Sequence, residues 1–362
     1  MKRALTLGWI SACMAGAAVA QEAPAPAVRP SSRNIRDLQI RGRIQAQAAY
    51  VQTENDAIDN DWSTMELRRV RLGMRGTLLQ SVRAQLEANL VPGSGLSMRS
   101  AFLEWREHRP AYIKLGLDKP VFGHEENTSS ASILTVERSL LTNTFAPGTM
   151  NGLSLSGTAQ ILSYGVGVYT DRDNRNPDHQ RADYLLNASA QLTLDMLIGQ
   201  TLRLRADVLN SADEEGNFGG GFESAIAASI HFAAGPFDLR AEYITGDARN
   251  GETTSGFYVM PSVHVTPQIQ AVARYEQMTS DSATGVRAAS RYARRVPGLE
   301  RPEEGADPTR GDAGSSIYLG ANYYLAGNNH KFMLGVERAQ IENTSEGTLT
   351  SLTVLGAWRM LF

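Results

Sequence analysis

Apolar side chains occupy every second position at the end of this chain. Counting back from the last residue, one face carries Phe362, Met360, Trp358, Gly356, Val354 and Leu352. The positions between them include Arg359, Ala357 and Thr353. A β-strand with this alternation presents one face to an apolar medium and the other to a polar one, and strands that cross a membrane need both. A strand of a soluble sandwich alternates in the same way, so the interpretation depends on how often the pattern recurs.

The pattern recurs in three consecutive segments near the N-terminus. Each places small or apolar side chains on one face and arginines, amides or acids on the other. The polar faces carry Arg41, Arg43, Gln45 and Gln47, then Arg69, Arg71, Gly73 and Arg75, then Arg83, Gln85, Glu87 and Asn89. Side chains of this kind rarely occupy a dry core. The alternation therefore indicates lipid outside and water inside.

Period-two alternation continues through the whole chain, whereas helical periodicity is scarce. It predicts sixteen strands, at residues 34–53, 62–80, 81–92, 95–107, 111–121, 150–159, 162–171, 181–195, 200–211, 221–233, 236–248, 254–265, 267–279, 314–326, 329–342 and 347–362. Long polar connections, such as 54–61, 172–180, 212–220 and 280–313, alternate with tight turns. Outer-membrane barrels have this arrangement of loops and turns, and sixteen strands leave an aqueous channel. The predicted fold is an all-β, 16-stranded antiparallel transmembrane outer-membrane β-barrel.

The connection at 122–149 differs in kind from the other long connections. It carries apolar side chains that must be buried, namely Ile133, Leu134, Val136, Leu140, Leu141 and Phe145. Packing on the inner wall of the barrel would bury them and narrow the channel, so we expect an inward-folded constriction loop. A lid outside the barrel and a subunit contact are the alternatives.

The N-terminus predicts export. Lys2 and Arg3 precede an apolar stretch, and Ala18-Val19-Ala20 forms a small-residue cleavage site, which is typical of a signal peptide. We expect a signal peptide at 1–20, a disordered Pro/Ala-rich leader at 21–33 and the barrel domain at 34–362. Ile10-Ser11-Ala12-Cys13 resembles a lipoprotein box and leaves lipidation as an alternative. Cys13 is the only cysteine, so no disulfide is expected in the mature chain.

Arginine provides nearly all of the positive charge. The net charge is −3, and lysine occurs only at positions 2, 114, 119 and 331. The planar guanidinium group matches phosphate and carboxylate geometry and stays charged in any environment. Codon usage in a GC-rich genome is an alternative explanation of the overall count.

Four motifs between residues 69 and 148 resemble the phosphate-selective porin O/P family in order and spacing. They are Arg69-Val-Arg71-Leu-Gly73-Met-Arg75-Gly76, Ala101-Phe-Leu-Glu-Trp105, Leu115-Gly-Leu-Asp-Lys119-Pro-Val-Phe-Gly123-His-Glu125 and Val136-Glu137-Arg138-Ser139. The resemblance implies a sixteen-stranded trimeric channel whose third outer loop constricts the pore. It also implies that inward basic residues select phosphate.

Candidate anion-binding residues come from the polar faces and from the resemblance. The first three strands place Arg41, Arg43, Arg69, Arg71, Arg75 and Arg83 on one wall, where rings or ladders of arginine favour anions. The resemblance adds Lys119 and Arg138, with hydroxyl donors at Ser129 and Ser130. Ion pairs with Glu87, Glu104 or the loop acids would instead give the transverse field of a general diffusion pore. Arg68 and Glu66 fall at even-numbered positions, on the face that the alternation assigns to lipid, which indicates a rim position or a β-bulge.

Other classes of function have less support in the sequence. The six histidines are scattered without metal-ligand spacing, and no cofactor, metal or nucleic-acid partner is expected. No Gly-x-Ser-x-Gly or His-Glu-x-x-His element occurs, so we expect a protein that is not an enzyme. An adhesive or structural barrel would require the 280–313 loop to dominate function. Aromatic girdles at the membrane interfaces are expected from Trp62, Trp105, Tyr112, Tyr169, Tyr243, Tyr258, Tyr323, Tyr324 and Trp358.

Together these patterns predict an outer-membrane porin, exported by the signal peptide and surrounded by the lipid bilayer. It would conduct small hydrophilic solutes passively as a homotrimer and prefer small anions, with phosphate or polyphosphate as candidates. A general non-specific diffusion porin is the alternative.

Overall fold

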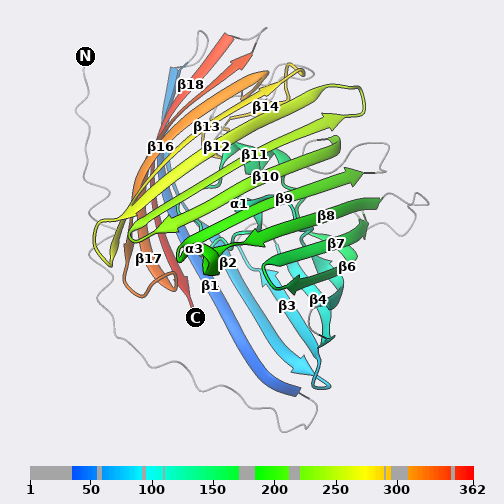
Figure 1. Cartoon of the computed structure of the whole chain (residues 1–362). Helices are drawn as coiled ribbons and strands as arrows, with labels where there is room; N and C mark the ends of the chain where they lie inside the picture. Colours follow the sequence, from blue (N-terminus) through cyan, green and yellow to red (C-terminus); the bar gives the residue numbers. More distant parts are fainter. Residues whose placement is uncertain are drawn as a thin grey trace.

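The chain folds into one closed β-barrel (Figure 1). The computed structural model describes residues 35–54, 59–91, 95–108, 111–170, 184–211, 221–288, 291–294, 309–343 and 347–362. The predicted signal peptide and leader lie outside the described residues. Every pair of neighbouring barrel strands is antiparallel, so the predicted fold is confirmed.

Sixteen strands make the barrel wall. They are β1 (Ile35–Glu54), β2 (Asp59–Leu78), β3 (Val82–Asn89), β4 (Ser97–His108), β5 (Ala111–Asp118), β6 (Met150–Ala159), β7 (Leu162–Thr170), β8 (Tyr184–Thr193), β9 (Thr201–Ser211), β10 (Phe222–Ala234), β11 (Phe237–Ala248), β12 (Thr253–His264), β13 (Ile269–Ser280), β16 (Ala313–Tyr324), β17 (His330–Asn343) and β18 (Gly347–Leu361). Each predicted strand is present, with bounds within three residues of the prediction.

In the part of the chain that the structure describes, five short elements lie outside the barrel wall and were not predicted. Strands β14 (Val286–Arg287) and β15 (Arg310–Gly311) form a small separate sheet. Helices α1 (His124–Asn127) and α2 (Leu140–Phe145) lie in the connection from β5 to β6, and α3 (Asp195–Ile198) lies in the turn from β8 to β9. Among the described residues, no helix is long and apolar enough to span a membrane.

The barrel closes where the first strand meets the last. The register of β1 against β18 runs from Arg43 opposite Leu361 to Glu54 opposite Thr350. The start of β1 and the end of β18 therefore lie at one end of the barrel, together with the short turns (Figure 1), and we call it the turn end. The opposite end, which carries the long connections, is the loop end. The first residues of β1 and the last of β2 extend the wall beyond the C-terminus at the turn end.

Gly42 allows the C-terminus to pack against β1. The backbones of Gly42 and Phe362 exchange two hydrogen bonds, of 2.7 and 3.1 Å. The Phe362 ring lies directly over Gly42, and a Cβ atom there would come within 2.1 Å of the ring. Any larger residue at position 42 would have to displace the terminal phenylalanine.

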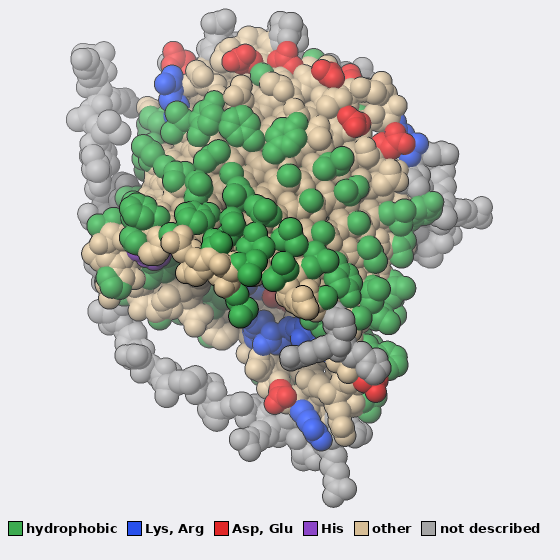
Figure 2. Space-filling model, viewed as in Figure 1, with side chains coloured by type: hydrophobic (Ala, Val, Ile, Leu, Met, Phe, Trp, Pro, Cys, Tyr) green, Lys and Arg blue, Asp and Glu red, His purple; other side chains and the backbone are tan. Residues whose placement is uncertain are grey.

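The outer surface carries a broad belt of hydrophobic side chains, with acidic side chains along its upper edge (Figure 2). Outward positions in the alternation are strongly exposed, as at Ile40 (59%), Leu115 (60%) and Leu319 (59%). Exposed apolar side chains over this area mark a surface made for lipid. The face assignments predicted for the first three strands and for the last strand are confirmed.

The aromatic prediction is right only for the outward side chains. Trp105, Tyr243 and Tyr323 are 46–54% exposed on the outer face. In contrast, Tyr169 and Tyr258 are buried inside the barrel, because they fall on the inward parity of their strands. Further inward aromatics are Trp62, which packs in an interior cluster, and Tyr324, which bonds Gln270.

Candidate functional site

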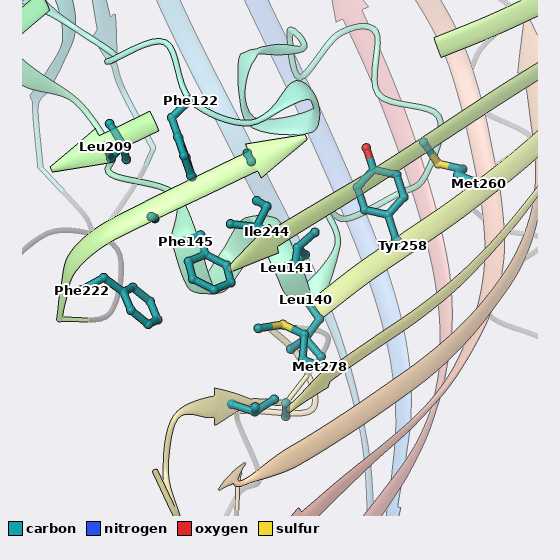
Figure 3. Close-up of a cluster of buried hydrophobic side chains, with 14 of the residues drawn as sticks. Phe122, Leu140, Leu141, Phe145, Leu209, Phe222, Ile244, Tyr258, Met260 and Met278 are labelled. Carbon is teal, nitrogen blue, oxygen red and sulfur yellow. The ribbon is translucent and has the colours of Figure 1, made fainter. Parts of the chain in front are cut away.

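The connection between β5 and β6, residues 119–149, folds into the barrel, and we call it the constriction loop. The six apolar side chains predicted to be buried are at most 5% exposed, namely Ile133, Leu134, Val136, Leu140, Leu141 and Phe145. The close-up in Figure 3 shows several of them beside side chains of the barrel strands. The inward fold is therefore confirmed over a lid or a subunit contact.

Apolar packing fixes the loop against one side of the barrel. Phe145 stacks on Phe222 of β10 with ring centroids 4.6 Å apart, and Leu140 and Leu141 join the same buried cluster as Met278 of β13. Fully burying a side chain of this size contributes about 1.5–3 kcal/mol. In a water-filled lumen this term keeps the loop on the wall rather than in solution.

Carboxylates of this wall bind the beginnings of the two loop helices. Glu242 on β11 accepts hydrogen bonds from the first backbone N–H groups of α1. Glu276 on β13 accepts one from the N–H of Leu140 at the start of α2, at 2.8 Å. Asp207 on β9 accepts one from the N–H of Gly123, at 3.0 Å. Free N–H groups at a helix start attract negative charge, so these acids are committed to the loop.

Cations and amides of the last strands bind the extended part of the loop through its carbonyl oxygens. Arg359 on β18 is fully buried and donates to carbonyls within residues 130–136, the shortest bond being 2.6 Å. Lys331 on β17 and Asn322 on β16 donate to carbonyls of the same segment, at 3.0 and 2.9 Å. We call β9–β13 and β16–β18, with the loop packed on them, the loop-covered wall.

Arg274 on β13 is the centre of an ion network beneath the loop. Its guanidinium lies 3.3 Å from Glu276, 3.2 Å from Glu337 and 3.7 Å from Glu125 of the loop. It also donates to the hydroxyl of Thr135. Glu125 is therefore turned away from the channel, although the sequence places it in the constriction loop.

The opposite side of the lumen, formed by β1–β5, is not covered in this way, and we call it the basic wall. Its inward cations are Arg41, Arg43, Arg71, Arg75, Arg83, Arg99, Arg106 and Lys114. Its inward acids are Glu66, Glu87, Glu104 and Asp118. Basic side chains outnumber acidic ones here, and low-dielectric walls strengthen their field.

Two β-bulges turn additional arginines inward. The register between β1 and β2 shifts at Arg68, and the register between β3 and β4 shifts at Arg99. A bulge inserts one extra residue and re-aims its side chain. Arg68 reaches Glu137 of the constriction loop at 2.8 Å, and Arg99 donates to Thr149. The β-bulge that the sequence indicated at Arg68 is confirmed. The sequence pattern around Arg99 did not indicate the second bulge.

Ion pairs reduce the positive charge of the basic wall only in part. Arg71 lies 3.5 Å from Glu87, Arg83 lies 3.7 Å from Glu104, and Lys114 lies 2.7 Å from Asp118. Glu104 also pairs with Arg106 and Lys114. Several cations thus share one acid, so the two readings from the sequence, an arginine wall and a salt-bridged wall, both describe part of the structure.

An open basin lies at the turn end of the basic wall. It encloses about 670 Å³, and its lining includes Arg75, Arg83, Arg106, Gln39 and Glu107. Arg75 donates to Gln39 at 2.5 Å, and Arg41 acts electrostatically on Arg75 and Arg83. Three of the predicted arginines therefore lie together, at a distance along the strands from the constriction.

The narrowest part brings the remaining predicted residues together. Arg43 donates to the hydroxyls of Ser130 and Ser129, the latter at 3.3 Å. Arg71 is electrostatically coupled to Arg43, Arg99 and Arg138. Together these groups place guanidinium and hydroxyl donors from the wall and the loop around one stretch of the lumen. Such donors suit an oxyanion.

The loop side of the constriction carries Lys119 and Arg138. Lys119 donates to the backbone carbonyl and the carboxylate of Glu126. Arg138 donates to the carbonyl of Thr128 at 2.8 Å and lies 3.5 Å from the carboxylate of Glu126. The resemblance assigned roles to the two cations, whereas the sequence alone did not show that Glu126 would stand between them.

Arg69 is placed differently from the other predicted arginines. Its side chain is buried, and it donates to the amide oxygen of Gln45 at 2.9 Å. Gln45 in turn donates to the carbonyl of Ser130 in the constriction loop. Arg69 therefore supports the edge of the loop, and its charge reaches the lumen only indirectly.

The long 280–313 connection contributes a second inward contact at the loop end. Tyr292 is fully buried and donates to Gln47 and Glu66, both at 2.8 Å. Its ring lies 6.4 Å from that of Trp62, and Arg291 pairs with Glu66 at 3.2 Å. Glu300, Glu303 and Glu304, which follow in the same connection, lie outside the described residues.

The described histidines do not assemble a metal site. No group of three or more His, Cys, Asp or Glu side chains that could hold a metal ion occurs among the described residues. His124 and His231 approach with ring centroids 5.8 Å apart. Burial and the nearby arginine charges lower the pKa of His124 to about 4, so it is neutral at pH 7 and acts as a polar neighbour of the loop.

A closed barrel with a lipid-facing belt, a wet lumen and an inward loop defines an outer-membrane porin, a channel for passive diffusion. The sequence model for phosphate-selective porin O and P matches residues 38–351. The chain therefore belongs to that family and resides in the outer membrane. No curated protein is a significant match.

Solved structures share the fold at low sequence identity. OmpT of Vibrio cholerae with loop L8 deleted is 13% identical, with 89% of this chain and 99% of that chain covered and a TM-score of 0.62. The outer-membrane channel DcaP of Acinetobacter baumannii is 12% identical, with 92% and 99% covered and a TM-score of 0.60. Salmonella typhi OmpF, solved with daunomycin, is 14% identical, with 89% and 97% covered and a TM-score of 0.56. At these identities the likeness shows the fold alone.

Proposed function

We propose that this porin prefers small anions, with phosphate and phosphate-like solutes as its leading substrates. One observation carries the proposal: the exposed wall of the lumen is basic, whereas most acids of the opposite wall are buried beneath the constriction loop. Asp207, Glu242 and Glu276 bond the loop backbone, and they present no free charge to a passing ion. The family description supports phosphate as a candidate.

The chemistry of the constriction fits an oxyanion. Guanidinium groups offer a planar fork of donors that matches two oxygens of a phosphate or carboxylate. Arg43 and Arg71 come from the basic wall, and Arg138 comes from the loop, with the hydroxyls of Ser129 and Ser130 beside Arg43. An anion at this point would meet donors from both sides.

A general diffusion porin is the second candidate. The ion pairs of Arg71 with Glu87 and of Arg83 with Glu104 favour it, because paired charges give a transverse field without strong selectivity. Charge reversal separates the two candidates. We expect Arg71→Glu, and likewise Arg75→Glu, to lower the preference for anions, while Arg338→Glu on the exposed outer face leaves it unchanged.

The measurement is the zero-current potential of the purified channel in a lipid bilayer across a potassium chloride gradient, repeated with phosphate. Anion preference, with phosphate reducing the chloride current, supports the proposal. Weak selectivity or cation preference in the wild type supports the general diffusion porin. Equal selectivity in wild type, Arg71→Glu and Arg75→Glu would remove the arginines of the basic wall from the explanation.

We also propose that the chain is exported by cleavage after Ala20 and assembles as a homotrimer. The small-residue cleavage site supports the first point. Membership of the family and the trimeric form of Vibrio cholerae OmpT support the second. Mass spectrometry of the mature N-terminus and light scattering of the detergent-solubilised protein test them separately.

A further inference from the structure

Glu126 is a carboxylate in the middle of the basic constriction. It belongs to α1 of the constriction loop and is 9% exposed. One carboxylate oxygen accepts a hydrogen bond from Lys119, and the other lies 3.5 Å from the guanidinium of Arg138. The two other acids of this loop segment face elsewhere, since Glu125 binds beneath the loop and Glu137 pairs with Arg68.

Charged groups of the barrel wall also act on Glu126. The positive groups whose charges act on it come from the loop, from β2 and from β4: Lys119 and Arg138 contact it directly, and Arg69, Arg71 and Arg99 act through their electrostatic field. The one carboxylate is thus shared among several cations. The site therefore has a net positive charge, and the carboxylate of Glu126 already occupies its donors.

A carboxylate presents two oxygens in the same planar arrangement that a guanidinium recognises in phosphate or in a carboxylate solute. Lys119 and Arg138 are the donors that an anion at the constriction would use, and Glu126 already occupies them. An incoming anion must therefore compete with Glu126, and it also meets a like charge at close range, which opposes binding.

We propose that Glu126 is an internal competitor of the transported anion, a residue that keeps anion binding at the constriction weak so that the solute can leave. The inference rests on the proposed anion preference and adds the residue that sets its strength. Conduction requires a site that binds strongly enough to admit a solute but weakly enough to release it. Glu126 promotes release of the solute, because its carboxylate binds Lys119 and Arg138 again as the solute moves on.

The same residue makes anion binding depend on pH. Burial raises the pKa of Glu126, although Arg138 and Arg99 act in the opposite direction. The carboxylate is therefore neutralised at a higher pH than an ordinary glutamate as the solution is acidified. Neutral Glu126 no longer competes, so acidification of the wild type should strengthen anion binding and should act in the same direction as Glu126→Gln.

The experiment compares wild type with Glu126→Gln and with the control Glu54→Gln, which removes an exposed carboxylate at the loop end of β1. Sulfate is the probe, because it remains a dianion from neutral to mildly acidic pH. The readouts are the sulfate concentration that halves the chloride current in planar bilayers and the zero-current potential. We expect Glu126→Gln to halve the current at an about tenfold lower sulfate concentration, and Glu54→Gln to behave as wild type.

Titration of the wild-type channel provides a measurement that requires no variant. Sulfate block should strengthen as the pH falls, and the dependence should be absent from Glu126→Gln. A wild type that is anion-selective but has the same sulfate block as Glu126→Gln at every pH would overturn the inference and leave the proposed function standing. Weaker sulfate block in Glu126→Gln would also overturn it, because Glu126 would then position the cations. Absence of anion preference from the wild type and Glu126→Gln alike would remove the proposed function and the inference together.

Discussion

The two walls of the lumen contain the same residue types but use them in different ways. On the loop-covered wall, Arg274 and Arg359 are buried and bind glutamates or loop carbonyls. On the basic wall, Arg75 and Arg83 line an open basin. An arginine on the inner face of a porin is therefore a structural anchor or an ion-contacting group, according to whether the constriction loop covers it.

The acidic side chains divide between the two walls in the same way, and this division makes the charge along the conducting path positive. The loop-covered wall carries Asp207, Glu242, Glu276 and Glu337, each held against the loop or against Arg274. The basic wall retains fewer acids than cations. A net charge of −3 for the whole chain is thus compatible with a positive conducting path.

Removal of the constriction loop should change the difference between the two walls more than any other change. A deletion within 128–141 exposes the buried anchors of the loop-covered wall, so both walls become accessible to ions. We expect the single-channel conductance to rise severalfold and the selectivity to weaken, as measured in planar bilayers. Unchanged conductance would show that the loop does not limit the bore.

Loss of the central arginine of the loop-covered wall should have the next largest effect. Arg274→Met leaves Glu276 and Glu337 without their shared cation, and such a loss costs about 3–5 kcal/mol. The free energy of unfolding in urea, followed in detergent or lipid, measures it. Arg338→Met on the exposed outer face is the matched control and should change stability by less than about 1 kcal/mol. Equal stability of the two variants would contradict the anchoring role.

Acid should weaken the ion pair that joins the basic wall to the loop. Burial alone would raise the pKa of Glu137, but Arg68 and Arg69 outweigh it and lower this pKa to about 2. The folded pKa is below the unfolded value of about 4.3, so the contribution to stability is present above that value and is lost as the pH falls towards 2. It amounts to about 3 kcal/mol at most. Between pH 5 and 2, the free energy of unfolding in urea should depend less steeply on pH for Glu137→Gln than for wild type. Parallel curves for the two proteins would show that this ion pair does not contribute to the pH dependence of stability.

The contact of the second loop should have the smallest effect. Tyr292→Phe keeps the ring against Trp62 but removes the hydroxyl that bonds Gln47 and Glu66. We expect a loss of about 1–3 kcal/mol, the cost of leaving buried partners unsatisfied, and more frequent brief closures or openings in the current record. Tyr275→Phe, whose half-exposed hydroxyl bonds Gln277, is the control and should leave the current record unchanged. A Tyr292→Phe current record identical to that of wild type would show that the contact of the 280–313 connection does not affect conduction.

Period-two alternation predicted the barrel well because its cause is local. Each strand must present alternate side chains to lipid and to water, so the sixteen strands and their faces could be read one segment at a time. The same rule failed at Arg99, where a bulge changes the parity. The expected place of Tyr258 in an aromatic girdle failed for a different reason, since this side chain has inward parity and is buried inside the barrel.

The candidate site was predicted in part. Arg43, Ser129 and Ser130 do meet, and Lys119 and Arg138 lie on the loop side of the constriction. Arg69 supports the loop edge instead, while Arg41, Arg75 and Arg83 lie near the turn end. Arg106 in the basin was missed. Glu126 was counted only among the acids of the loop, and its place between Lys119 and Arg138 was not predicted, because contacts across a lumen depend on the path of the loop.

The sequence by itself determined the strand number, the lipid-facing belt and the inward burial of the constriction loop, because each follows from the polarity of neighbouring positions. Only the tertiary structure decided which wall the loop covers, which acids it removes from the channel and which cations remain beside the solute path. Those outcomes depend on side chains more than a hundred residues apart, as with Glu242 and the start of α1. Electrostatic and hydrogen-bonding contacts of this range are set by barrel closure, and no local pattern encodes them.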